Sequence, residues 1–194
     1  MTQPSTPAGA APATTPRIDL WRPVLLRAAA ALVFGAVTVF WTSPSVEVMG
    51  WAGGLYLLAA GLVSLRTVPA AGLAQNSGKM LSAAGAVLAG AGFAVLLLHS
   101  DLLFGVIAAL GLGVAGLLEL ACGLRHRGRH VLARDWIASG VIGIGTAALL
   151  PFFVSLGAHA LLGVTGGGAI VSGVLWVLSG LTLRHDARGV AGKP

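Results

Sequence analysis

Six long apolar runs dominate this sequence and limit the folds open to it more than any other feature. The runs occupy residues 24–42, 46–65, 80–98, 102–121, 136–154 and 159–183. Each has about 18 to 25 residues, the length that a helix rising 1.5 Å per residue needs to cross a hydrocarbon core of about 30 Å. The runs contain almost no charged residues, and they lack the alternating pattern of membrane β-strands. We therefore expect an all-α polytopic membrane protein with six transmembrane helices.

The composition excludes an ordinary soluble domain. Only 9% of the 194 residues are charged, whereas soluble domains average about 25%, and the mean hydropathy is +0.90. The transmembrane domain is expected at residues 19–185, followed by a short tail at 186–194. The segment before it, residues 1–18, is rich in Pro, Ala and Thr and has too little apolar surface to bury, so it is expected to be disordered.

The basic residues fall on alternate connections of this six-helix scheme. All 12 lie near the first helix start, between helices two and three, between four and five, or after helix six: Arg17, Arg22, Arg27, Arg66, Lys79, Arg125, Arg127, Arg129, Arg134, Arg184, Arg188 and Lys193. The other three connections, around Glu47, at 99–101 and at 155–159, contain no Lys or Arg. Basic loops remain in the cytoplasm, so both termini are expected to be cytoplasmic.

The densest basic segment is LRHRGRH, residues 124–130, which we expect to be a cytoplasmic loop beside anionic lipid head groups. His126 and His130 are four positions apart and could share a metal ion. However, Gly128 separates them, and no carboxylate or thiol is close enough in sequence to complete a site. The loops are also too short to read nucleic acid, and the single cysteine, Cys122, allows no disulfide or cysteine metal cluster. We expect no metal, no cofactor and no nucleic-acid partner.

The helices repeat in pairs. The tails SLR, GLR and TLR end at a spacing of 59 residues, at Arg66, Arg125 and Arg184. The first helices of the pairs align at a spacing of 55, which matches Gly35, Gly90 and Gly145. Fixed-period similarity marks a repeated supersecondary unit. We expect three parallel helical hairpins, an organisation that secondary transporters also use, at about 22–66, 80–125 and 135–184.

Several glycines have spacings that favour close helix packing. Gly50 with Gly54 and Gly163 with Gly167 form GxxxG pairs, which let helix backbones approach in a membrane. With the glycines of the repeat, the candidate helix-packing residues are Gly35, Gly50, Gly54, Gly90, Gly145, Gly163 and Gly167. These residues can serve packing within one chain or a homo-oligomer, and the sequence leaves both open.

One acidic residue, Glu119, lies inside an apolar run, about one turn from the expected cytoplasmic end of the fourth helix. Arg27 has a similar depth in the first helix. An ionisable residue in a membrane segment is a functional hypothesis by default, so Arg27 and Glu119 form the candidate intramembrane charge pair. A structural tie of Glu119 to Arg27 or Arg125 and a role coupled to protons or cations both remain open. No acidic residue lies near the expected bilayer midplane, which argues against a typical proton-driven transporter but allows a passive pore.

Three residues on the other side are candidates for a response to pH. His99 and His159 lie at the mouths of the second and third hairpins, and Asp101 is close to His99 in sequence. Histidine gains a positive charge as the pH falls through about 6.5. The alternative is that these histidines are ordinary interfacial residues with no switching role.

WRPVLLRAAAALVFGAVTVFWTSPS, residues 21–45, resembles the opening of the HdeD-type acid-resistance membrane proteins, a short-repeat family. The residues that carry the resemblance are Trp21, Arg27, Gly35, Trp41 and Pro44. GGLYLLAAGLVSL, residues 53–65, resembles the second helix of the family's first repeat. The resemblance implies six helices in hairpin repeats, a place in the bacterial inner membrane and an association with acid stress. It implies no catalytic site.

The sequence contains no Ser-His-Asp grouping, no HExxH motif and no carboxylate pair with a catalytic spacing. We therefore expect a non-enzymatic membrane protein of the HdeD type that aids acid or envelope-stress tolerance through protein or lipid contacts. A small transporter or channel is one alternative, favoured by the parallel repeats. A membrane scaffold subunit of a larger complex is another.

Overall fold

The computed structural model describes residues 20–191, with side chains described as far as Arg188. This part of the chain forms six α-helices and one short 3-10 helix. The elements are α1 (Trp21–Phe40), α2 (Val46–Ala71), α3 (Gln75–Leu97), α4 (Asp101–Arg125), α5 (Ala133–Phe153), η1 (Val154–Leu156) and α6 (Gly157–Ala191). The expected disordered tail at 1–18 lies outside the described residues.

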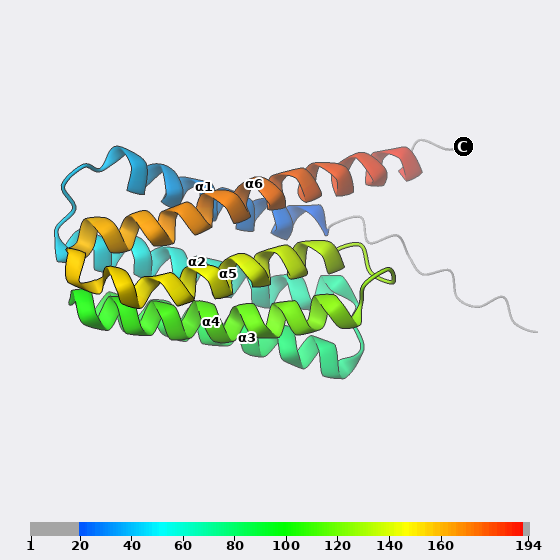
Figure 1. Ribbon diagram of the computed structural model, residues 1–194. Helices are drawn as coiled ribbons and strands as arrows, with labels where there is room; N and C mark the ends of the chain where they lie inside the picture. Colours follow the sequence, from blue (N-terminus) through cyan, green and yellow to red (C-terminus); the bar gives the residue numbers. More distant parts are fainter. Residues whose placement is uncertain (1–19, 192–194) are drawn as a thin grey trace, which may run out of the picture.

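Five stretches of the described chain are long and apolar enough to cross a membrane. Four of them are α1 to α4, and the fifth, Ala133–Arg188, contains 56 residues and includes α5, η1 and most of α6. A straight helix of that length would extend about 84 Å, more than twice the thickness of a hydrocarbon core. The chain instead reverses direction around η1 (Figure 1). The protein is an all-α polytopic membrane protein.

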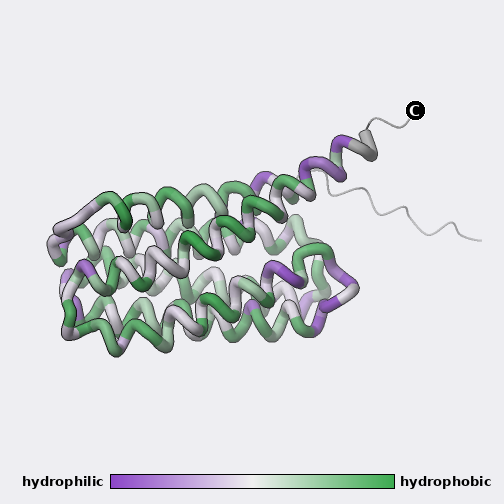
Figure 2. The backbone as a smooth tube through the Cα atoms, turned by 45° about the horizontal axis from the view of Figure 1, so that its top comes forward, coloured by the Kyte–Doolittle hydropathy of each residue, from purple (hydrophilic) through white to green (hydrophobic). Residues whose placement is uncertain are grey.

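Successive helices run antiparallel and form a closed ring (Figure 1). Each helix packs on the next one in the chain, and α6 packs along α1 to close the ring. The start of α1, the α2–α3 turn, the α4–α5 loop and the end of α6 lie together at one end, which we call the basic end because the described Lys and Arg residues lie in or near these segments. The α4–α5 loop and the end of α6 are strongly hydrophilic, whereas apolar residues predominate along the helices (Figure 2).

Capping side chains and glycines mark the turns between helices. The Ser45 side chain accepts a hydrogen bond of 3.2 Å from the backbone N–H of Val48 and so caps the start of α2. The helix ends at Ala71 and is followed by Gly72, whose φ of 55° is the left-handed conformation that glycine adopts most readily. Gly157 has a φ of 80° where the chain reverses after η1. These short connections place neighbouring helices side by side.

The helices extend beyond the predicted apolar runs, mainly at the basic end. The second helix continues from residue 65 to Ala71, and the third begins at Gln75 instead of residue 80. The last helix continues to Ala191, so residues 186–191, expected as part of a tail, are helical. Hydropathy does not detect these additional helical turns. Helical backbone hydrogen bonds continue there through residues that are too polar to belong to an apolar run.

Glycines bring three helix pairs into close contact, with backbone facing backbone in the first two pairs and side chain in the third. In the α2–α3 pair, a Cβ atom added at Gly61 would lie 2.4 Å from the backbone nitrogen of Ala89. In the α4–α5 pair, a Cβ added at Gly140 would lie 2.6 Å from the carbonyl oxygen of Gly116. In the α1–α6 pair, a Cβ added at Gly173 would lie 2.9 Å from the Leu32 side chain. Without a glycine at these positions, the paired helices could not pack so closely.

Large apolar side chains divide between the inside of the ring and its outer surface. Phe34, Leu57 and Phe104 are at most 4% exposed and belong to a core along the middle of the bundle. Other large apolar side chains, such as those of Phe40 and Leu110, are more than 60% exposed on the outside. An outer surface this rich in apolar side chains fits contact with the lipid bilayer.

Candidate functional site

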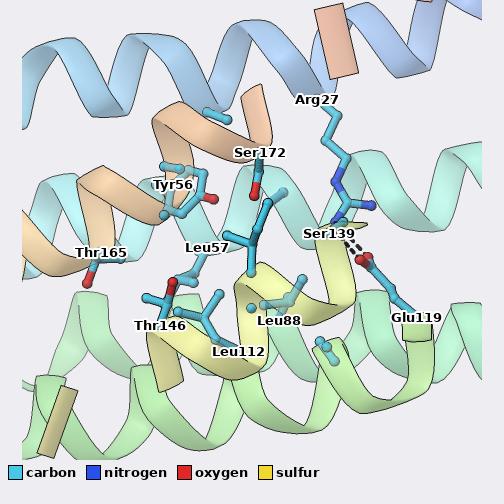
Figure 3. A pocket seen from close by; sticks show the side chains of 18 of the residues that line it. Arg27, Tyr56, Leu57, Leu88, Leu112, Glu119, Ser139, Thr146, Thr165 and Ser172 are labelled. Carbon is cyan, nitrogen blue, oxygen red and sulfur yellow. Dashed lines mark hydrogen bonds and ion pairs between the residues drawn. The ribbon is translucent and has the colours of Figure 1, made fainter. Parts of the chain in front are cut away.

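An arginine and a glutamate meet inside the ring near its basic end. Arg27 is about two turns into α1, and Glu119 is six residues before the end of α4, or about 9 Å along its axis. The Arg27 Nη2 atom lies 2.6 Å from Glu119 Oε1, and the two side chains are 14% and 3% exposed. The pair that the sequence analysis singled out is thus brought together across the bundle (Figure 3).

Helix periodicity places Glu119 on the inner side of α4. Ala108, Ala115 and Cys122 are buried on the same helix, and together with Glu119 they follow the three- and four-residue spacing of one helix face. The glutamate therefore occupies a position that the rest of the helix fills with small buried residues. Its carboxylate must find its partners within the protein.

A serine of α5 completes the hydrogen bonding of the pair. Ser139 donates its hydroxyl proton to Glu119 Oε2 and accepts a hydrogen bond of 3.2 Å from Arg27 Nη2. Each carboxylate oxygen of Glu119 thus has its own partner. A buried polar network is stable when its members are all bonded, because each unsatisfied group carries its full desolvation cost.

An indole of α6 covers the guanidinium. Arg27 Cζ lies 4.6 Å from the ring centroid of Trp176, which is 2% exposed. A cation over an aromatic ring away from water is stabilised by about 2 kcal/mol. Four helices, α1, α4, α5 and α6, therefore hold one electrically neutral arginine–glutamate site.

A cavity lined by apolar residues and several polar side chains adjoins the pair on the side away from the basic end. Its volume is about 40 Å³, and residues of all six helices line it. Its polar side chains other than the pair include Tyr56, Ser139, Thr146, Thr165 and Ser172 (Figure 3). A space of this size holds a few water molecules or a ligand of a few heavy atoms.

A second, smaller cavity adjoins the pair on the side of the basic end. Its volume is about 10 Å³, and its lining includes Ser64 and Thr67. Arg27, Glu119 and Trp176 line both cavities. The arginine–glutamate site is therefore the partition between them.

Apolar packing closes the ring between the larger cavity and the end opposite the basic end. Met49, Phe104 and Leu161 are at most 1% exposed in this region. Phe34 stacks on the Tyr56 ring, with the centroids 4.4 Å apart. The described structure is therefore closed toward the opposite end.

Sequence reasoning missed Ser139 and Trp176. Ser139 is one of the few hydroxyl residues in its apolar run, and nothing in its sequence position links it to Arg27 or Glu119. Trp176 lies within a helix, away from the ends where interfacial tryptophans gather. That central position was a signal of a buried role.

The candidate pH-responsive residues lie at the end opposite the basic end. The His99 ring packs on Gly50 and lies 6.0 Å from the Trp51 ring, while His159 is exposed. The Oδ1 atom of Asp101 is buried without a hydrogen-bond partner among the described residues. No hydrogen bond or ion pair joins His99, Asp101 and His159 in the described part of the chain, so their response to pH stays a prediction.

The candidate packing glycines separate into two groups. Gly35 faces Ile170, Gly50 faces His99 and Gly54 faces Leu96, in each case so closely that an added Cβ would clash. The other four are exposed and have open space at the Cβ position: Gly90, Gly145, Gly163 and Gly167. The first group packs within the chain, and the second faces outward.

The LRHRGRH segment contacts the end of α2 and the start of α3. His126 Nε2 lies 2.8 Å from the Ser77 hydroxyl. His130 Nδ1 accepts the backbone N–H of Leu132, so Nε2 carries the proton and donates to the Ala71 carbonyl at 3.0 Å. The described residues contain no group of three or more His, Cys, Asp or Glu side chains placed to hold a metal ion. These contacts of the two histidines join the α4–α5 loop to α2 and α3 at the basic end.

Comparison with protein-family models, curated protein sequences and solved structures found no match for this chain.

Proposed function

We propose that this protein is a small, non-enzymatic membrane transporter whose substrate site is the cavity beside Arg27 and Glu119. The observation that carries the proposal is the position of this ion pair between two cavities inside the ring. Buried ion pairs add little net stability compared with well-packed apolar residues. Ionisable groups within membrane segments characteristically mark substrate, ion or proton pathways.

The apolar packing around Phe104 and Leu161 favours a transporter over a channel. An open channel needs a continuous passage, whereas a transporter has one side closed at any moment. The sequence argument against a proton-driven transporter rested on the shallow position of Glu119. It loses weight because the larger cavity extends from Glu119 to Thr146 and Thr165, deeper in the helices.

Three parallel hairpin repeats with six spans complete the proposed architecture. The close helix pairs α2–α3, α4–α5 and α1–α6 are equivalent under a threefold arrangement of the hairpins α1–α2, α3–α4 and α5–α6. The second helices α2, α4 and α6 also contact one another across the ring, whereas α1, α3 and α5 do not contact one another in the described part of the chain. Both patterns support the repeat. Transport would then come from movement of one hairpin against its neighbours.

We propose a bacterial plasma membrane location with the basic end and both termini in the cytoplasm. The charge asymmetry supports this orientation. A reporter that is active only outside the cytoplasm should stay silent when fused after Lys193 and become active when inserted at residues 155–159. The reverse pattern would contradict the orientation.

The transport proposal is tested with purified full-length protein in liposomes. The probes are sodium nitrate, sodium chloride, sodium formate, potassium chloride, glycerol and urea, each followed by stopped-flow light scattering. At least one probe should enter about tenfold faster than into protein-free liposomes. Glu119→Ala should remove this difference, whereas Glu47→Ala, which changes an exposed carboxylate, should keep it. Background rates for every probe with folded protein would contradict the proposal.

Tolerance to acid or envelope stress through protein or lipid contacts is the second candidate function. It is favoured by the resemblance of residues 21–45 and 53–65 to the HdeD-type proteins. A strain that lacks the gene should survive low external pH less well, and the intact gene should restore survival. A gene with both His99→Ala and His159→Ala should fail to do so if these histidines respond to acid. Equal survival of all strains would remove this function.

A homo-oligomer is favoured by the outward-facing pair Gly163 and Gly167, which leaves open space on the surface of α6. Close helix contact in membranes uses such pairs. Light scattering in mild detergent should give a multiple of the chain mass, and Gly163→Leu should reduce it to that of one chain. A monomeric wild-type protein would contradict the oligomer. A scaffold subunit would instead retain a second protein in fixed ratio.

A further inference from the structure

The charge of the arginine–glutamate site restricts what it can bind. The Arg27 guanidinium remains protonated at any pH that a protein meets. The Glu119 carboxylate can be charged or neutral. With both groups charged, the site has no net charge, and 14% and 3% exposure leave little water to compensate for an added one.

We propose that the site binds a small monovalent anion together with one proton. A bound cation would give the site a net charge of +1, because arginine cannot release a proton in exchange. An anion alone would give a net charge of −1. An anion on Arg27 with a proton on Glu119 leaves the site neutral, so it avoids the cost of an unpaired buried charge.

The exchange balances in charge and atoms. One proton from solution bonds to a carboxylate oxygen of Glu119, and the ion pair with Arg27 is lost. The anion then takes the place of that carboxylate on the guanidinium, and no other covalent bond changes. Release of the anion and the proton restores the pair.

The cavity fits this class of ligand in size and in hydrogen-bond donors. About 40 Å³ suits an anion with about one to four heavy atoms, such as chloride, formate or nitrate. Tyr56, Thr146 and Ser172 have hydroxyls at the cavity (Figure 3) with no hydrogen-bond partner among the described residues. These hydroxyls can donate to an anion beside Arg27.

Few other titratable groups face the pair. Tyr56 of α2 and Cys122 of α4 interact electrostatically with Glu119, and Asp135 of α5 interacts with Arg27. Asp135 accepts a hydrogen bond from Ser179 of α6. From α3, only Leu81 and Leu88 reach the two cavities. Glu119 is therefore the group of this site best placed to take up the proton, because it forms the direct contact with Arg27.

This inference rests on the proposed function, because it assigns a substrate class to the same site, but it is tested by binding. Formate is titrated into purified full-length protein by calorimetry in two buffers with different ionisation enthalpies, which counts the protons taken up. Wild-type protein should take up one proton per formate. Its dissociation constant for formate should rise about tenfold for each unit of increase in pH, over the pH range in which each binding event requires Glu119 to take up one proton. The tryptophan emission of the protein should change on binding in wild type, because Trp176 covers Arg27, and it should stay constant in Trp176→Phe.

Matched variants separate the two partners. Glu119→Gln imitates the protonated glutamate, so it should bind formate with no proton uptake and no pH dependence. Arg27→Gln should lose binding, and the exposed variants Glu47→Gln and Arg66→Gln should behave like wild type. If Glu119→Gln does not fold, the proton count and the pH slope of the wild type still decide the question.

The proposal is overturned by formate binding without proton uptake, by sodium binding in its place, or by no binding of formate, chloride or nitrate to monodisperse protein. Formate binding with uptake of one proton, but without flux into liposomes, would support the proposed ligand class. In that case only the transport proposal would be contradicted. Flux of formate as a lone anion would contradict the proton and support transport.

Discussion

Among single residues, the proposed function depends most on two charged side chains and on the two side chains that contact them. Arg27 and Glu119 stood out in the sequence because charged side chains are rare in apolar runs, so their pairing could be predicted. Ser139 and Trp176 could not, because serine and tryptophan are common in membrane helices and only the fold shows which ones meet the pair. The same limit applies to Asp101, because the burial of its Oδ1 atom depends on packing that the sequence does not show.

Because Arg27 and Glu119 form an ion pair, mutations of these two residues should have strongly coupled effects on the free energy of unfolding. Arg27→Gln and Glu119→Gln should each lower the free energy of unfolding by about 3 kcal/mol, because each leaves a buried charge without its partner. The double variant removes both charges, so it should cost less than the sum of the two single variants by more than 1 kcal/mol. Denaturant titration in mixed micelles measures the four proteins. Additive effects would mean that the two charges do not interact.

Helix packing illustrates what the sequence can and cannot predict at the scale of elements. The existence of the helices followed from the length of the apolar runs, although their ends did not. The hairpin α1–α2 was predicted as a unit, yet the backbones approach most closely in pairs such as α2–α3. Rotation of each helix about its axis decides which glycines face a neighbour, and a composition dominated by Gly, Ala and Leu gives that rotation no clear signal.

Two glycines of α5 provide a matched test of this packing. A Cβ at Gly140 would clash with the Gly116 carbonyl, whereas a Cβ at Gly145 meets open space. Gly140→Ala should therefore lower the free energy of unfolding by about 1–3 kcal/mol. Gly145→Ala should leave it unchanged or raise it by about 0.5–1 kcal/mol, because alanine favours the helix. Thermal unfolding in detergent compares them, and equal effects would argue against the observed contact between α4 and α5.

At the scale of the whole molecule, the closed ring matters most for function because it encloses the cavity beside Arg27 and Glu119. The membrane character followed from length and composition. Packing of α6 along α1 did not, since nothing in a linear repeat says that the last helix meets the first. The cavity lined by six helices exists only because this contact closes the ring.

A disulfide between the first and last helices tests ring closure. In a Cys122→Ala background, Ala31→Cys and Gly173→Cys should cross-link on oxidation, because a Cβ at Gly173 would lie 3.2 Å from the Ala31 Cβ, close to disulfide geometry. With a protease site inserted in the loop after Arg125, the two fragments should stay joined until reduced. Ala31→Cys with Gly145→Cys is the control and should separate. Separation of the first pair would contradict the ring.

Nitrate-driven proton entry decides whether the arginine–glutamate site carries an anion with a proton, and it is measured in liposomes that contain the full-length protein and the pH-sensitive dye pyranine. The account predicts that an inward nitrate gradient acidifies the lumen faster than in protein-free liposomes, even when potassium and valinomycin clamp the membrane potential. Arg27→Gln should abolish this acidification, and Arg66→Gln should not. No nitrate-dependent acidification by folded wild-type protein would contradict transport of an anion with a proton through the arginine–glutamate site.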